Sequence, residues 1–173
     1  DNPWIKVVED QIIKPNGEPG IYGAVHFKNY ALGIVALAED QDIWLVGQYR
    51  YVLQTYSWEI PTGGGSREVP PLDGAKRELR EETGLTANLW EELIHFNLSN
   101  AISDELGMIY LAEDLKQGPT EFDDTEVLEI KKIPFADALE MVFRREIMDS
   151  MSVVGILAVA NKKGLMYRAN NGL

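Results

Sequence analysis

One segment in the first half of the chain combines dense charge with the spacing and the ending of a helix. Arg77–Leu85 reads RELREETGL and contains three glutamates, Glu78, Glu81 and Glu82. With about 3.6 residues per turn, Glu82 lies roughly 40° around the helix axis from Glu78, and Glu81 lies roughly 60° to the other side. The segment therefore predicts a helix with three carboxylates on one face. Gly84 fits the position just past the helix end, where a left-handed backbone is needed.

Three carboxylates on one helix face need a nearby cation to offset their mutual repulsion. Like charges one turn apart repel, and each raises the pKa of the other unless a cation lies between them. Arg77 and Arg80 offer such a cation, which would make the segment an ordinary solvated helix face. The alternative is a divalent metal ion, because Mg²⁺ and Mn²⁺ prefer oxygen ligands and Mg²⁺ is often held jointly by carboxylates and substrate phosphates. We favour the metal ion, with Glu78, Glu81 and Glu82 as its ligands.

The same segment carries a resemblance to a known family. Arg77–Leu85 resembles the second half of the Nudix box, GX5EX7REUXEEXGU, and matches that half at every specified position. Counting back puts Gly63 at the box glycine and Val69 where the family has its first glutamate. The nearest acid is Glu68, so either the loop is shifted by one residue or the role of that glutamate is lost.

The resemblance implies a fold and a set of residue roles. Nudix hydrolases form an α/β/α sandwich with a mixed sheet, and we expect this domain over residues 31–173. In the family the helix glutamates hold the metal and the neighbouring arginine orients them, which makes Arg77 and Gly84 structural members of the box. Beside the box, Gly63–Gly65 indicates close backbone approach, with a carbonyl near Gly63 as a further metal ligand. Taken alone the glycine run predicts a flexible loop, and it is not a P-loop because no Lys-Ser/Thr follows it.

Composition sets the broad class of the protein. The chain has 173 residues, of which 45% are apolar and 25% charged, as in one soluble globular domain. The net charge of −12 argues against a nucleic-acid partner and means that any phosphate site must be made positive locally. The lack of cysteine excludes a disulfide framework and thiol catalysis. We find no signal peptide or membrane-spanning run, and expect a cytoplasmic protein without a membrane partner.

The N-terminal pattern predicts a separate pair of strands. Ile5–Ile13 and Ile21–Phe27 are rich in β-branched residues and are separated by the turn sequence Lys14–Gly17. They predict an antiparallel pair within residues 1–30. Similar Nudix proteins are commonly dimers that share their N-terminal strands, so the resemblance implies a homodimer in which Trp4 contributes to the neighbouring subunit's site.

The rest of the chain alternates strands and helices. Ala31–Ala38 and Ile43–Tyr51 predict two buried, neighbouring strands. Asp149 is placed to cap the last helix. The segments after the box are predicted strands over Ala87–Leu98, Gly107–Ala112 and Val127–Ile133, and predicted helices over Phe135–Arg145 and Met151–Lys163.

A segment after the box suggests substrate-binding groups. Ser103–Glu105 resembles the end of the SPGxSDE stretch of ADP-ribose pyrophosphatases, which makes Ser103 and Glu105 candidates for contact with substrate. Asn100 stands where that group has proline. This departure shifts the expected substrate from ADP-ribose towards other nucleoside diphosphate sugars.

The acidic run Glu121–Glu126 has two interpretations. Four acids in a short stretch are typical of a solvated loop. In the resembling subfamily, however, an acidic loop at this place carries the glutamate that activates water. Alignment on the following strand makes Glu126 the first candidate, with Glu121 and Asp124 behind it, and Glu81 of the box is a further catalytic candidate.

Other candidate residues lie before the box or on predicted strands. Arg50 resembles the arginine that meets the substrate phosphates in ADP-ribose pyrophosphatases, and an exposed surface arginine is the alternative. Trp4 and Tyr49 are candidates for stacking on a base or sugar, with core packing as the alternative. His26 and His95 have no neighbours that would complete a catalytic triad, so we expect them to be structural.

These features lead to one main hypothesis and two alternatives. The main hypothesis is a Mg²⁺-dependent pyrophosphohydrolase that cleaves ADP-ribose or another nucleoside diphosphate sugar to a nucleoside monophosphate and a sugar phosphate. One alternative is a different diphosphate substrate, such as coenzyme A, NADH or a dinucleotide polyphosphate. The other is a Nudix-like domain that binds a nucleotide without cleaving it.

Overall fold

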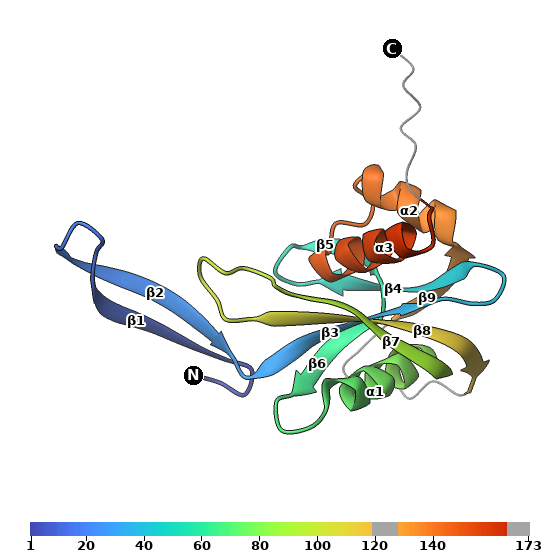
Figure 1. The fold of residues 1–173 in the computed structure, drawn as a ribbon, viewed down its shortest axis with the longest axis horizontal. Coiled ribbons are helices and arrows are strands. Elements are labelled where there is room, and N and C mark those ends of the chain that lie inside the picture. The colour runs from blue at the N-terminus through green and yellow to red at the C-terminus, as the bar shows by residue number, and fades with distance from the viewer. Residues whose placement is uncertain (119–127, 166–173) are drawn as a thin grey trace, which may run out of the picture.

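The architecture is an α/β/α sandwich, described here from a computed structural model of residues 1–118 and 128–165. Figure 1 shows α1 (Pro71–Thr83) on one side of the strands, and α2 (Phe135–Phe143) and α3 (Ser150–Lys162) on the other. The predicted fold class is therefore confirmed. None of the described helices is long and apolar enough to cross a membrane.

Two sheets form the middle of the sandwich. The larger sheet has the strand order β6-β3-β8-β7 and is mixed, because β3 and β8 run parallel while the other pairs are antiparallel. The smaller sheet has the order β5-β4-β9 and is antiparallel. The strands are β3 (Asn29–Ala36), β4 (Asp42–Arg50), β5 (Thr55–Glu59), β6 (Thr62–Ser66), β7 (Leu85–Asn97), β8 (Leu106–Gln117) and β9 (Glu129–Pro134).

The predicted N-terminal strand pair forms a sheet of its own. β1 (Ile5–Ile13) and β2 (Pro19–Phe27) pair antiparallel in register from Ile5 opposite Phe27 to Ile13 opposite Pro19. Figure 1 shows this pair extending away from the body of the sandwich. Apolar side chains remain exposed on it, as described below.

Strand β3 connects the two halves of the hydrophobic core. Its side chains alternate, so that Leu32 and Ile34 join the cluster against α1 while Val35 joins the cluster against α3. These three side chains are 0% exposed. A strand covered on both faces needs apolar residues at successive positions, which explains the continuous apolar run in the sequence.

The expected pairing of β3 with β4 is wrong. These strands lie in different sheets and meet only at the isolated bridge between Leu37 and Ile43. Both edges of β3 are already paired, with β6 on one side and β8 on the other, so no edge is left for β4. The predicted strands were right, but their neighbours depend on contacts between distant parts of the chain.

The glycine run is a strand and not a flexible loop. Gly63–Gly65 belongs to β6 and pairs with β3. A Cβ on Gly65 would lie 2.5 Å from Leu32 Cδ1, closer than real Cβ contacts. Glycine therefore lets a strand pass directly beneath the packed helix α1, as the interpretation of close backbone approach required.

The helix ends agree with the caps read from sequence. Gly84 follows α1 with φ 71°, and its N–H donates to the Arg80 carbonyl at 2.8 Å. Asp149 caps α3 by accepting a hydrogen bond from the Ser152 N–H at 2.8 Å. Both ends satisfy backbone groups that a helix leaves unpaired.

We predict that Gly84→Ala lowers the free energy of unfolding by about 1–2 kcal/mol, because an L residue is strained in the left-handed conformation. Urea unfolding followed by circular dichroism measures the change. Gly84→Asn is the matched control, since asparagine also occurs at this left-handed position and should lose less stability. Equal unfolding curves for the Gly84→Ala variant and the native chain would contradict the prediction.

Candidate active site

A cavity of about 390 Å³ opens where β3, β4 and β6 meet the end of α1 and the loop before β8. It gathers residues that are far apart in sequence. Five of the residues singled out from the sequence line it: Trp4, Arg50, Gly63, Glu82 and Glu105. The cavity therefore brings these five candidate residues together.

Glu82 is buried at the end of α1. The residue is 3% exposed, and its Oε2 accepts a hydrogen bond from the Thr62 N–H at 2.9 Å. Thr62 is the first residue of β6, so this bond joins the last turn of the helix to the strand beneath it. A carboxylate so deeply placed at a cavity wall is held in one orientation by the backbone.

Glu78 lies against the backbone of Gly63. A Cβ at Gly63 would lie 2.0 Å from the carboxyl carbon of Glu78, a full overlap. Only glycine therefore fits beneath this carboxylate. The box glycine and the first box-helix glutamate, fifteen positions apart in the sequence, are in direct contact.

Arg77 binds two of the three helix carboxylates. Its Nη1 donates to Glu81 Oε2 at 2.6 Å, and its Nη2 donates to Glu78 Oε1 at 2.5 Å and to the Gly64 carbonyl at 3.0 Å. The arginine thus ties α1 to β6 and contacts both carboxylates. Glu81 points to this arginine and does not line the cavity.

The donor atoms around the cavity suit a hard cation. Glu82 and Gly63 line the cavity and Glu78 packs against Gly63, so carboxylate oxygens and backbone carbonyls, the ligand types that Mg²⁺ takes, lie near one another. Across residues 1–118 and 128–165, no three His, Cys, Asp or Glu side chains lie close enough together to hold a metal ion.

Arg50 stands at the end of β4 with a partner that the sequence analysis missed. Its Nε donates to Glu59 Oε1 at 2.9 Å, and its Nη2 binds Glu59 Oε2. The hydrogen bond to Glu59 raises the pKa of the Arg50 guanidinium, and the nearby charges of Asp149 and Glu82 add to the effect. The signal in the sequence was a single glutamate between Trp58 and Ile60 in an otherwise apolar strand end.

Glu105 reaches the cavity from a loop that is tied to β2. Burial raises the pKa of Glu105, and the charge of Asp104 adds to the effect. Asp104 accepts a hydrogen bond from the Phe27 N–H at 2.8 Å, and His26 Nδ1 lies 2.7 Å from its other oxygen. His26 therefore has the structural role that we expected. Ser103 donates to the Ser99 carbonyl and does not line the cavity.

The remaining candidates lie outside the cavity or at its rim. Tyr49 is 60% exposed and does not line the cavity, because Gln48 and Arg50 on either side of it point there. Trp4 is 67% exposed although it lines the cavity. The proposed bases Glu121, Asp124 and Glu126 lie outside the described residues.

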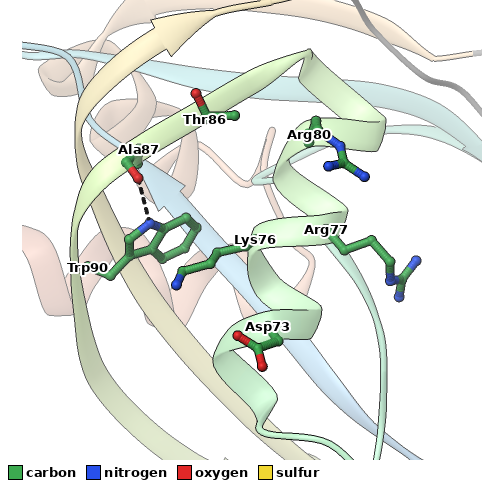
Figure 2. Close-up of a pocket in the computed structure, with 7 residues that line it drawn as sticks. All are labelled: Asp73, Lys76, Arg77, Arg80, Thr86, Ala87 and Trp90. Carbon is green, nitrogen blue, oxygen red and sulfur yellow. Dashed lines mark hydrogen bonds between the residues drawn. The ribbon is translucent and has the colours of Figure 1, made fainter.

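A second, smaller cavity of about 240 Å³ lies between α1 and β7. Figure 2 shows Lys76 extending towards the indole of Trp90, while Arg77 and Arg80 leave the other side of the helix. The Trp90 Nε1–H donates to the Ala87 carbonyl at 3.0 Å. None of the candidate glutamates within the described part of the chain lines this cavity.

Comparison with known proteins agrees with this geometry. A model of the NUDIX domain matches residues 28–151. The chain is 35% identical to an ADP-ribose pyrophosphatase of Mycobacterium tuberculosis over 155 residues, 87% of this chain and 73% of the relative. It is 32% identical to an ADP-ribose pyrophosphatase of Bacillus subtilis over 160 residues, 91% of this chain and 85% of the relative.

The fold is also similar to that of a solved structure. A crystal structure of an ADP compounds hydrolase superposes with a TM-score of 0.84 at 22% identity, covering 95% of this chain and 90% of the other. The family model covers well over half of the chain, and it includes the helix with its three glutamates and most of the residues that line the cavity beside it. This chain therefore belongs to the NUDIX domain family.

Proposed function

We propose that this protein is a Mg²⁺-dependent pyrophosphohydrolase that cleaves the diphosphate of ADP-ribose, or of another nucleoside diphosphate sugar, to a nucleoside monophosphate and a sugar phosphate. One observation carries the proposal. The buried carboxylate of Glu82 and the backbone of Gly63, against which Glu78 packs, share one cavity with the guanidinium of Arg50. The similarity to two ADP-ribose pyrophosphatases supports the choice of substrate.

The carboxylates of Glu78 and Glu82, with the Gly63 carbonyl, would hold the cation, and Glu81 is a further candidate ligand. A divalent cation, Mg²⁺ or Mn²⁺, supplies positive charge against the diphosphate and lowers the pKa of the attacking water. This charge is needed because the chain as a whole carries a net charge of −12 and would repel the substrate.

The chain's own residues would orient the reactants. Arg77 keeps Glu78 aimed at β6, and the Thr62 N–H does the same for Glu82. Arg50, which lines the cavity, would meet the phosphates. The water's proton would pass to a nearby carboxylate, for which Glu126 is the first candidate.

Contacts to the rest of the substrate are proposed for residues around the cavity. Glu105 would accept hydrogen bonds from sugar hydroxyls, and Ser103 would support the loop that carries it. Trp4, which lines the cavity, would stack on the base or sugar. Tyr49 is a weaker candidate within one subunit because its side chain does not line the cavity.

A panel of ADP-ribose, other nucleoside diphosphate sugars, NADH, coenzyme A and dinucleotide polyphosphates, incubated with Mg²⁺, tests the function. Release of nucleoside monophosphate from ADP-ribose or another sugar nucleotide supports the proposal. Preferential cleavage of one of the other compounds would replace it. Calorimetric binding without any cleavage would indicate the non-catalytic binding domain instead.

We predict that Glu82→Gln lowers Mg²⁺-dependent turnover at least about 100-fold, because the cation contributes several kcal/mol of charge stabilisation. The fold should survive, since a glutamine oxygen can still accept the Thr62 hydrogen bond. Initial rates of monophosphate release and a thermal melt measure the two effects. Glu140→Gln on α2, which pairs only with the surface residue Arg144 in the described structure, is the matched control. Near-normal turnover of the Glu82 variant would defeat the assignment.

We predict that Glu126→Gln lowers turnover by about 10²–10⁴-fold, the usual contribution of a general base. Glu121→Gln and Asp124→Asn in the same run are the matched controls and should have smaller effects. Rates at saturating substrate and Mg²⁺ make the comparison. A large loss confined to Glu121→Gln would move the role of base to Glu121.

The homodimer is the second part of the proposal. In the β1–β2 register Val7, Ile13 and Ile21 share one face of the pair, and they are 63%, 70% and 61% exposed. A two-stranded sheet is marginal without a partner for its apolar face. We propose that a second copy of the chain covers this face. Trp4 lines the cavity of its own subunit, so its proposed stacking contact needs no second copy. The cytoplasmic location remains a prediction from sequence.

We predict that the native chain sediments as a dimer and that Val7→Lys shifts it towards monomer, because a charge then enters the apolar face. Sedimentation velocity at several concentrations measures the change. Asp10→Lys is the matched control, since Asp10 lies on the opposite face of β1 and should leave the dimer intact. A native chain that sediments as a monomer at all concentrations would contradict this prediction.

A further inference from the structure

Glu59 is a buried carboxylate that has no role in the proposed reaction. Its side chain is 2% exposed, whereas that of its partner Arg50 is 39% exposed. The carboxylate faces the guanidinium with both oxygens, one receiving Nε at 2.9 Å and the other receiving Nη2. Such a two-point pairing fixes the direction as well as the position of the guanidinium plane.

Stability alone is a poor explanation for this pair. Removing a carboxylate from water costs several kcal/mol, and apolar residues of similar volume are often at least as stabilising as a buried ion pair. Ile60, the next residue in the chain, is fully buried in the hydrophobic core, and Trp58 packs against that core. The presence of a charge between them is better explained by its effect on Arg50.

Arg50 lies where its orientation matters. It lines the candidate active-site cavity of about 390 Å³ and also a neighbouring cavity of about 520 Å³. Asp149 lines both cavities as well. Glu59 takes the Nε side of the guanidinium, so the remaining N–H groups are left to a ligand. A guanidinium without this anchor would be able to turn into either cavity.

Two other carboxylates compete for Arg50. Asp149 and Glu82 are close enough for their charges to act on the guanidinium. Asp149 Oδ2 already accepts hydrogen bonds from the backbone N–H and the hydroxyl of Ser152, each at 2.8 Å. Glu82 Oε2 accepts from Thr62. Release from Glu59 would let Arg50 turn towards either carboxylate, and Glu82 is the one proposed to hold the cation.

We infer that Glu59 is a positioning residue: it holds the Arg50 guanidinium towards the diphosphate of the substrate and keeps it from turning to Asp149 or Glu82. Glu59 itself would touch neither the substrate nor the cation. The nature of the ligand rests on the proposed function, whereas the pairing and its direction rest on the contacts between β4 and β5.

A double-mutant cycle on ligand binding tests the inference. The variants are Glu59→Gln, Arg50→Gln and the double variant, and the probe is α,β-methylene ADP-ribose with Mg²⁺, measured by calorimetry. Each single variant should weaken the Kd about tenfold, the size expected for losing a charge-assisted hydrogen bond. The double variant should bind within about twofold of Arg50→Gln alone, because the two residues act as one unit.

Turnover of ADP-ribose supplies a second readout. Glu59→Gln should raise KM by about the same factor as Kd and change kcat less than about threefold, as expected for lost binding that is equal in ground and transition states. Glu113→Gln is the matched control: it breaks an ion pair with Lys163 whose residues line neither cavity, and KM should not change.

Three results would overturn the inference. The first is an unchanged Kd in a folded Glu59→Gln variant, and the second is a Glu59→Gln change that weakens the Kd by the same factor in the native chain and in the Arg50→Gln variant. The third is no binding of the probe by the native chain. If Glu59→Gln does not fold, Glu59→Asp replaces it in the cycle, since it keeps the charge but withdraws the carboxylate. A native chain that binds the probe but never cleaves ADP-ribose would defeat the proposed function, while the cycle would still decide the role of Glu59.

Discussion

The contact between the carboxylate face of α1 and the backbone of β6 organises this molecule. Glu78 packs on Gly63, Glu82 accepts from Thr62, and Arg77 reaches the Gly64 carbonyl from the same helix. Three side chains of one helix are thus held by three successive residues of one strand. The contact places acidic groups at a cavity wall without leaving them to swing in solvent.

That contact is possible because the surrounding core holds the strand and the helix close together. Because Gly65 has no side chain, the Leu32 side chain of β3 can pack directly against it. Leu32 belongs to the apolar cluster that packs against α1. Arg50, which lines the same cavity, is likewise held in place by its hydrogen bonds to Glu59. In both places a charged side chain points in one direction because a second group, either backbone or carboxylate, holds it.

Much of the fold was predictable from local patterns. The segments Ile43–Tyr51, Gly107–Ala112 and Phe135–Arg145 were expected as two strands and a helix, and β4, β8 and α2 lie there. Apolar periodicity predicts such elements because it is a local property of the sequence. Their neighbours were not predictable in the same way. The expected β3–β4 pairing failed because β8, from a distant part of the chain, occupies the edge of β3.

The sequence by itself determined the carboxylate face of α1, the glycine at its end and the family to which the chain belongs. All three depend on the helix spacing and the box residues, which lie in one short stretch of the chain. Only the tertiary structure decided which candidates share a cavity. It brought Arg50 and Glu105 to Glu82, left Tyr49 outside, and gave Arg50 the partner Glu59. The physical reason is that a side chain's direction and burial depend on the packing of separate strands, which no local spacing specifies.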